Sequence, residues 1–554
     1  MKIKFLLSLF LGSALSMSAQ GYLDGVEYYR ADQFSAAKTI LERTLNEAST
    51  DRATSHYYLG QVAMEFNDKE TAKSNFEKGV AANPENPYNY VGLAAVALAN
   101  GDKKAADENV KKAKSLGKKD AQLLVDIARV YFNADAVAYD KDIQKAMKEA
   151  LKADKESAAY FIFIGDTIAL NVKNNEDAGK AAANYDNAIY YDPNSAVAYV
   201  KYSNLYKKVA PQFSIDKMRE YIKTNPNSIL ARRELANRLY DLGRWTQAVE
   251  AFGPVVTNSN HLVEDEERYA TLLLAGENYE EAYQVAKAVL GRTENPNQMY
   301  RIMMHSKSSL EDYTEAAKWA QELLKSKGVA KIVDIDHLTY GSILEGLAAN
   351  DAANAATHYA EAIAQYDEAL KVNDKCYDAY KSKSSLYNKM GDFVNAVASF
   401  EAFMATGEAK AGDYHTYAGR LLNYANNVSK TDEAAAVAIY DKAAAAATTG
   451  VERSNSPYAQ ERKAIILFSK NSGMAEEVAV AFEKVVELLD SNPSYASDSD
   501  TYKTALGQLG DYYSRIGQNE KAIAAYERYL KYAPENNKVR ERIEYLKTIP
   551  ATEE

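Results

Sequence analysis

The chain has little of what disulfide-bonded, metal-binding or catalytic proteins need. Its 554 residues include one cysteine, two tryptophans, six histidines and 11 prolines. The single cysteine, Cys376, excludes a disulfide within the chain and a lipid-anchored cysteine directly after an N-terminal leader. No two histidines have the spacing of a zinc-protease motif, and neither a P-loop nor a Gly-x-Ser-x-Gly elbow is present. We therefore expect no metal, no cofactor and no enzymatic activity.

Basic residues are fewer than acidic residues in this chain. The chain has 66 basic and 77 acidic residues, a formal net charge of −11, and no long basic run. Such a balance disfavours nucleic acid and anionic membrane surfaces as partners. Hydrophobic residues make up 47% of the chain, which suffices for a folded protein. Alternating β-branched runs are absent, while Ala, Glu, Lys, Leu and Tyr dominate, so we predict an all-α fold.

A repeated pattern is clearest near the C-terminus. Small and large apolar residues alternate there at helical spacing over a unit of about 34 residues; they are Leu506, Leu509, Gly510, Tyr513, Ala522, Tyr526, Tyr529 and Pro534. This spacing predicts two antiparallel helices, with Gly510 and Ala522 allowing close approach and the tyrosines filling the gaps. The pattern recurs in about fourteen units between Tyr22 and Pro534. Residues 537–547 predict a final helix that caps the open end, with Val539, Ile543 and Leu546 on one face.

The order of these residues resembles the tetratricopeptide repeat (TPR) family. The resemblance implies an all-α superhelical solenoid of helix-turn-helix repeats that scaffolds protein–protein interactions without catalysis. Several units depart from the standard length. Ala348–Thr357 is the largest insert and predicts lengthened helices, and Asn426–Asp432 is a polar insert. Ser326–Asp336 is longer than a normal turn between repeats, so we predict a hinge there, between an array at 20–328 and a second at 329–549.

Residues 1–19 have the pattern of a secretory signal peptide. Lys2 and Lys4 form a basic end, Phe5–Leu15 is a short apolar core, and small residues lead to a predicted cleavage after Ala19. The apolar core is too short to span a bilayer, and no other segment has the length and hydropathy of a span. We expect the mature chain in the periplasm of a Gram-negative bacterium, soluble or peripheral at the outer membrane.

The resemblance also indicates where a partner binds. In the TPR family the first helix of each unit lines a concave groove, with the fifth and ninth positions facing inward. On this chain those positions include Tyr57 and Val200, and the most coherent polar group among them comprises Asn204, Arg233, Asn237, Arg301 and His305. Arginine and asparagine on adjacent helices can hold a carboxylate or a backbone amide of a protein or peptide. The group is similar to a carboxylate clamp, but Glu267 interrupts it and the clamp lysine is absent; the alternative is a solvated helix face.

Two further features have competing explanations. Trp245 and Trp319 predict either packing against helices or platforms on which sugars stack, and the 42 tyrosines raise the same question. A glycan-binding accessory of an outer-membrane uptake system is therefore the alternative to a protein scaffold. Asp334, Asp336 and His337 form the nearest approach to a metal-ligand cluster, but capping of the following helix explains them better.

Overall fold

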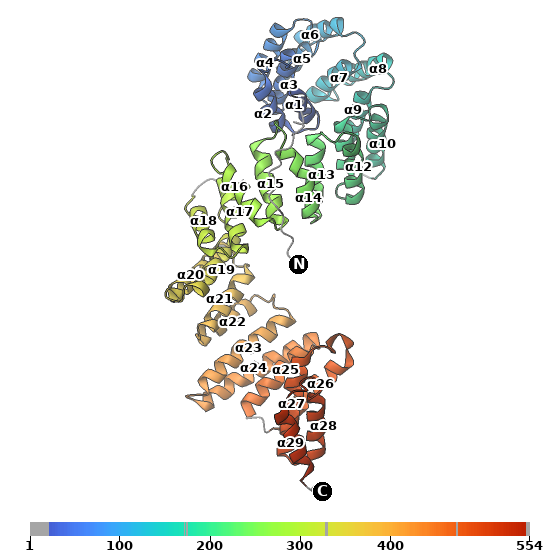
Figure 1. The fold of residues 1–554 in the computed structure, drawn as a ribbon. Helices are drawn as coiled ribbons and strands as arrows, with labels where there is room; N and C mark the ends of the chain where they lie inside the picture. Colours follow the sequence, from blue (N-terminus) through green and yellow to red (C-terminus); the bar gives the residue numbers. More distant parts are fainter. Residues whose placement is uncertain (1–20, 171, 173–174, 327–330, 472–474, 550–554) are drawn as a thin grey trace, which may run out of the picture. The chain divides into compact units, whose positions relative to one another are not determined.

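The fold was obtained as a computed structural model that describes residues 21–170, 172, 175–326, 331–471 and 475–549. The predicted signal peptide and the centre of the predicted hinge lie outside these residues. The chain forms two compact units, residues 1–329 and 330–554 (Figure 1). Within the described residues all regular structure is helical.

The first unit contains eighteen α-helices among its described residues. They are α1 (Tyr22–Arg30), α2 (Phe34–Thr44), α3 (Arg52–Glu65), α4 (Lys69–Ala82), α5 (Tyr88–Ala99), α6 (Lys103–Leu116), α7 (Ala121–Asp135), α8 (Asp140–Ala153), α9 (Ala158–Ala169), α10 (Asn175–Tyr191), α11 (Ala196–Tyr206), α12 (Pro211–Thr224), α13 (Ile229–Asp241), α14 (Trp245–Val256), α15 (Val263–Ala275), α16 (Tyr279–Val289), α17 (Pro296–Ser309) and α18 (Tyr313–Lys325).

The second unit contains eleven more in the part that the structure describes. They are α19 (Asp334–Asn350), α20 (Ala355–Val372), α21 (Tyr377–Lys389), α22 (Phe393–Met404), α23 (Ala411–Val428), α24 (Glu433–Ser454), α25 (Pro457–Asn471), α26 (Glu476–Ser491), α27 (Ser499–Arg515), α28 (Asn519–Tyr529) and α29 (Asn537–Lys547), with a short 3₁₀ turn, η1 (Pro493–Tyr495), before α27.

Consecutive helices pack as hairpins from α1–α2 through to α27–α28. This arrangement confirms the predicted all-α solenoid of fourteen helix pairs. The last helix, α29, packs on α28 and buries Ile543 and Leu546, as expected of a cap. Repeat arrays need such a cap because the terminal pair would otherwise expose an apolar face to water.

Short polar residues begin many of the helices. The side chains of Asp68, Asp102 and Asp392 each accept a hydrogen bond from a backbone N–H in the first turn of the helix that follows. Such caps satisfy a donor that the helix itself leaves without a partner, and each contributes about 1 kcal/mol. The residue before each of these aspartates has a positive φ, filled by Asn67, Gly101 and Gly391. A left-handed residue followed by a cap therefore sets the tight turn inside many hairpins.

Within a hairpin, a small residue on the first helix faces an aromatic ring on the second. A Cβ added at Gly510 would lie 2.4 Å from the ring of Tyr526, and one at Gly60 would lie 2.3 Å from Phe76. Gly165 and Gly341 face Tyr185 and Tyr366 in the same way. The predicted packing role of Gly510 is confirmed, since only a residue without a side chain leaves room for the ring.

The predicted insert at Ala348–Thr357 lengthens the helices on either side of it. Helices α19 and α20, around Ala348–Thr357, are 17 and 18 residues long, which confirms that they are lengthened.

Asp334, Asp336 and His337 lie inside the first turn of α19 rather than before it, and Asp336 accepts a hydrogen bond from the backbone N–H of Val333 at 2.9 Å. Capping accounts for Asp336, and no cluster of three possible metal ligands occurs in the residues that the structure describes.

The first unit closes on itself. Helix α1 contacts α11 and α13, and Tyr28 and Ile40 share a core with Val200 and Leu235. The first helix pair therefore covers surface on repeats that lie far along the chain. This explains why Val200, predicted to line an open groove, is buried. Tyr57, predicted to line the same groove, is also buried, but in a local cluster with Phe76 and Tyr88.

Candidate protein-binding surface

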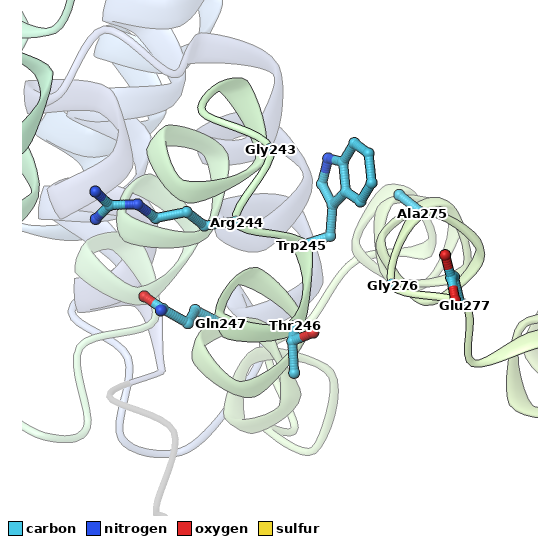
Figure 2. A pocket seen from close by; sticks show the side chains of 8 residues that line it. All are labelled: Gly243, Arg244, Trp245, Thr246, Gln247, Ala275, Gly276 and Glu277. Carbon is cyan, nitrogen blue, oxygen red and sulfur yellow. The ribbon is translucent and has the colours of Figure 1, made fainter. Parts of the chain in front are cut away.

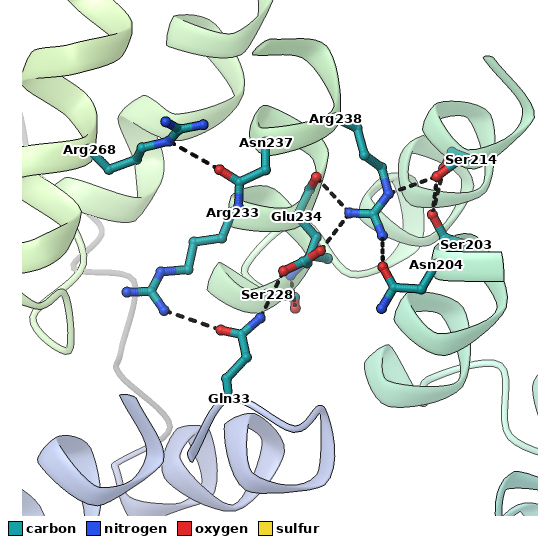
Figure 3. A network of polar contacts seen from close by, with 11 residues as sticks. Gln33, Ser203, Asn204, Ser214, Ser228, Arg233, Glu234, Asn237, Arg238 and Arg268 are labelled. Carbon is teal, nitrogen blue, oxygen red and sulfur yellow. Dashed lines mark hydrogen bonds and ion pairs between the residues drawn. The ribbon is translucent and has the colours of Figure 1, made fainter. Parts of the chain in front are cut away.

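The five predicted partner-binding residues lie on three first helices of the N-terminal unit. Asn204 is on α11, Arg233 and Asn237 are on α13, and Arg301 and His305 are on α17. Asn204 is exposed and the other four are half-buried. Figure 3 shows that Asn204, Arg233 and Asn237 belong to one region of internal polar contacts. Arg301 and His305 each have an interaction of their own.

Arg233 is held inside the fold. Its guanidinium forms an ion pair with Asp265, whose side chain is only 3% exposed, and lies 4.9 Å from the centre of the Tyr28 ring. Its Nη1 also reaches Oε1 of Gln33 at 3.5 Å, so Arg233 connects α13 with α15 and with the first repeat (Figure 3). Although burial alone lowers the pKa of Arg233, Tyr28 and Asp265 raise it above its ordinary value. The guanidinium stays charged and the Arg233 side chain is 12% exposed, which differs from the solvated helix face that is the alternative at this position.

Asn204 and Asn237 are engaged by neighbouring arginines. Arg238, which is buried, donates to Oδ1 of Asn204 at 2.8 Å, to Oγ of Ser214 at 2.7 Å and to Oε2 of Glu234 at 2.6 Å. Arg268 donates to Oδ1 of Asn237 at 3.2 Å. Both amides therefore keep their NH₂ groups, which can donate to a ligand, while their oxygens are occupied.

Sequence reasoning missed Arg238, although Glu234 four residues before it was a visible signal. The missed residue joins the helices α11, α12 and α13 into one polar network (Figure 3). Glu234 extends this network to the first repeat, because Gln33 donates to its Oε1 at 2.8 Å.

Further polar contacts tie the first repeat to the middle of the unit. Arg43 donates to the backbone oxygen of His261 at 3.0 Å, and Asn260 donates to Oδ2 of Asp24 at 2.7 Å. Lys201 bridges Asp32 at 2.8 Å and Asp166 at 3.1 Å. These pairs line the closure between α1–α2 and the helices α9, α11 and α15, and they were not foreseeable without knowing that the unit curls back.

The pKa values of two carboxyl groups near this contact are raised by their surroundings. Burial raises the pKa of Glu27, on α1, from 4.5 to about 7, and the nearby charge of Asp24 adds to the effect. Asp126, on α7, also has a raised pKa because of burial, which Arg30 and Arg129 offset in part. The docking of the first repeat is therefore sensitive to protonation in the mildly acidic range.

A second surface feature lies at the turn between α13 and α14. Trp245 is 44% exposed and lines a shallow depression of about 400 Å³ with Arg244, Gln247 and Glu277. Figure 2 shows its indole standing at the edge of the α13–α14 turn, facing Ala275 at the end of α15. Trp319, in contrast, is buried and stacks on Tyr300 with ring centres 6.0 Å apart, so the packing explanation is confirmed for that residue. Trp245 is half-exposed, so packing against helices and stacking of sugars both remain explanations for this residue.

None of the helices in the described segments is long and apolar enough to cross a membrane. Cys376 is buried at the start of α21, where burial raises the pKa of its thiol, so it remains protonated and unreactive at neutral pH.

Consecutive helical hairpins, joined by hydrogen bonds and ion pairs between their helices, define a helical-repeat solenoid. Two models of the tetratricopeptide repeat family match the chain, one at residues 53–86 and 504–536 and the other at residues 347–414. The chain thus contains tetratricopeptide repeats in these three segments. Proteins of this family scaffold protein–protein interactions, generally without catalysis, and the repeats imply protein partners.

Several solved structures are similar to the chain. The C-terminal part of a TPR repeat-containing protein from Cytophaga hutchinsonii is 20% identical, covering 50% of this chain and 98% of that one, with a TM-score of 0.43. The APC/C hetero-tetramer Cut9–Hcn1 is 12% identical, covering 89% and 99%, with a TM-score of 0.30. A thermophilic TPR protein of Thermus thermophilus is 14% identical, covering 39% and 100%, with a TM-score of 0.25. No curated protein matches the chain.

Proposed function

We propose that this chain is an exported, non-enzymatic scaffold that binds a protein partner in the periplasm of a Gram-negative bacterium. The observation that carries the proposal is the repeat array itself, in which three first helices of the N-terminal unit, α11, α13 and α17, present polar groups. Asn237 offers an amide whose NH₂ group is available, and Arg301 and His305 lie half-buried on α17. Charged and amide donors on the first helices of one repeat array suit the carboxylates and backbone carbonyls of a peptide.

Arg233 has a supporting role in this proposal. Its ion pair with buried Asp265 and its contacts with Tyr28 and Gln33 hold the first repeat against α13. We therefore assign partner contact to Asn204, Asn237, Arg301 and His305, and assign Arg233 to positioning the surface that they form.

The test is a crosslinking pull-down of the mature protein from its native envelope. The double variant Asn237→Ala/Arg301→Ala removes two partner-facing groups and leaves the Arg233–Asp265 pair in place. Two charge-assisted contacts correspond to a loss of more than about tenfold in affinity for the captured partner. The matched control is Asn46→Ala/Arg52→Ala, which changes the same residue types at exposed positions. Equal capture by the double variant and the control would show that the partner uses another surface.

The compartment has its own test. What supports export is the basic, apolar and small-residue order of residues 1–19. We expect N-terminal sequencing of the cellular protein to begin near Gln20, and fractionation to place it with the periplasm or the outer membrane. Retention of Met1 would exclude both the signal peptide and the compartment.

Glycan binding in an outer-membrane uptake system is a second candidate, favoured by the exposed indole of Trp245. Arg244, Gln247 and Glu277 line the same depression and carry the hydrogen-bonding groups that sugar hydroxyls require, with the side chains of Arg244 and Gln247 directed away from the indole (Figure 2). A glycan-binding screen with the wild type, Trp245→Ala and the exposed-aromatic control Phe66→Ala separates the two functions. Binding that Trp245→Ala alone abolishes would favour the glycan function, and a screen without hits would exclude it.

A further inference from the structure

Three nitrogen-bearing side chains on two helices of the second unit have no carboxylate as an ion-pair partner among the described residues. His415 and Arg420 lie on α23, and Arg462 lies on α25. These are the first helices of consecutive hairpins and they pack directly against each other. The cluster belongs wholly to the C-terminal unit, and no sequence motif singled it out.

The contact between His415 and Arg462 fixes the histidine tautomer. Nη2 of Arg462 lies 3.4 Å from Nε2 of His415. A guanidinium can only donate, so Nε2 accepts and the ring hydrogen sits on Nδ1. Burial and the charge of Arg462 both lower the pKa of His415, which keeps the ring neutral. Its Nδ1 atom is buried and has no partner among the described residues.

Both arginines also hold donors without acceptors. The Nε atoms of Arg420 and Arg462 are buried and unpartnered among the described residues. Burial lowers the pKa of Arg420, and the like charge of Arg462 lowers it further. The guanidinium of Arg462 lies beside the backbone of α23, with its Cζ 3.7 Å from where a Cβ at Gly419 would stand. Arg462 thus lies beside the residue that precedes Arg420, and neither cation has an ion-pair partner among the described residues, where a neutralising group is expected.

The neighbouring carboxylate of Glu461 forms no ion pair with either arginine in the described part of the chain. Burial and the charge of Asp498 raise the pKa of Glu461, and the charge of Arg462 offsets this in part. Elsewhere in the chain, half-buried arginines have carboxylate partners, as Arg129 does with Asp166 and Arg233 with Asp265. Arg420 forms no ion pair with any residue that the structure describes.

We propose that His415, Arg420 and Arg462 form an anion-binding site that takes a carboxylate from an acidic segment of a protein partner. Guanidinium groups match carboxylates in a bidentate geometry, and two of them side by side can hold both oxygens of one carboxylate. His415 accepts from Arg462 through Nε2 and so holds that guanidinium in place. The chain as a whole carries a net charge of −11 and so repels an acidic segment. The positive charge of this cluster therefore determines where such a segment can bind.

The test measures binding of labelled peptides to the full mature chain. The probe is a peptide rich in Asp and Glu, and its counterpart has Asn and Gln at those positions. We expect the acidic peptide to bind and its amide counterpart to bind at least about tenfold more weakly. Inorganic phosphate, as a competitor, separates a carboxylate site from a site for free oxyanions. Full displacement by phosphate together with equal binding of both peptides would overturn the carboxylate assignment.

The double variant Arg420→Gln/Arg462→Gln locates the site. We expect a loss of acidic-peptide affinity of at least about tenfold, against no loss in the control Lys430→Gln/Lys538→Gln, which removes the same charge from exposed lysines of the same unit. Relief of like-charge repulsion leaves the variant folded, and its melting temperature should equal or exceed that of the wild type. Unchanged peptide binding by this variant, or no binding by the wild type, would overturn the proposal. Because the double variant changes groups of the second unit only, failure here leaves the capture test of the partner surface on the first unit unaffected, and the two failures are distinguishable.

Discussion

At the scale of single residues, the hairpin packing depends on positions where a methyl group does not fit. Gly510 is the clearest, since its neighbour is the buried ring of Tyr526 rather than a flexible chain end. The sequence pattern predicted this position correctly because the spacing of Leu506, Gly510 and Tyr513 places them on one helical face.

Gly510→Val should destabilise the last repeat by roughly 1–3 kcal/mol, because the tyrosine ring must move to admit the side chain. Thermal melts and limited proteolysis near Gly510 measure the effect. The control is Gly412→Val, at a helical glycine with open space around the added carbon. Identical melts for the two variants would contradict the packing geometry.

Arg233 behaves differently from a solvated groove residue. Replacing it with alanine should cost about 3–5 kcal/mol, because the buried carboxylate of Asp265 loses its ion-pair partner. Urea unfolding measures the change, with Arg52→Ala as the surface control. The double variant Arg233→Ala/Asp265→Asn should recover part of the loss, since the amide needs no counter-charge. A cost for Arg233→Ala as small as that of the control would show that the ion pair is not important for stability.

At the scale of elements, helix α1 carries a protonation-dependent contact. The pKa of Glu27 is about 7 in the folded chain against an ordinary 4.5, because burial disfavours its charge and Asp24 repels it. The folded state therefore binds this proton more tightly than the unfolded state. The stabilisation is complete below about pH 4.5 and is lost as the pH rises through about 7.

The docking of α1–α2 should accordingly weaken between about pH 5 and 7.5, by up to about 3 kcal/mol for this group alone. Hydrogen exchange of the α1 and α2 amides at the two pH values measures it. Other carboxyl groups also titrate, so the informative quantity is the difference between wild type and Glu27→Gln, which should have little pH dependence at this contact. Equal pH dependence in the two proteins would exclude Glu27 as the cause.

At the scale of the N-terminal unit, closure couples repeats that are distant in sequence. A linear repeat array is stabilised mainly by contacts between neighbours. Here α1 and α2 share a core and polar bridges with α11, α13 and the start of α15. Local changes in the first repeat should therefore be felt far along the chain.

Deleting residues 20–50 should lower hydrogen-exchange protection in α11 and α13 as well as in neighbouring α3. Deleting α29 as a control should affect α27 and α28 only, because α29 packs on α28 and shares the core of the last repeats. Unchanged protection in α11 and α13 after the first deletion would show that closure contributes nothing to stability.

The sequence by itself determined the repeat: helical spacing, glycine opposite aromatic rings, aspartate caps and the final capping helix all depend on residues within one unit of about 34 positions. It did not determine which inward positions reach solvent. Val200 and Arg233 follow the same repeat rule as Asn237, yet Val200 is buried under the first repeat and Arg233 pairs with Asp265. The cluster of His415, Arg420 and Arg462 likewise comes from two helices joined only by packing. The physical reason for the closure is range, because periodicity records contacts within and between neighbouring repeats, whereas closure of the first unit depends on the accumulated curvature of the array. For the cluster, the repeat rule fixes which helices are neighbours but not which polar side chains on them face each other, and only the tertiary structure decides this.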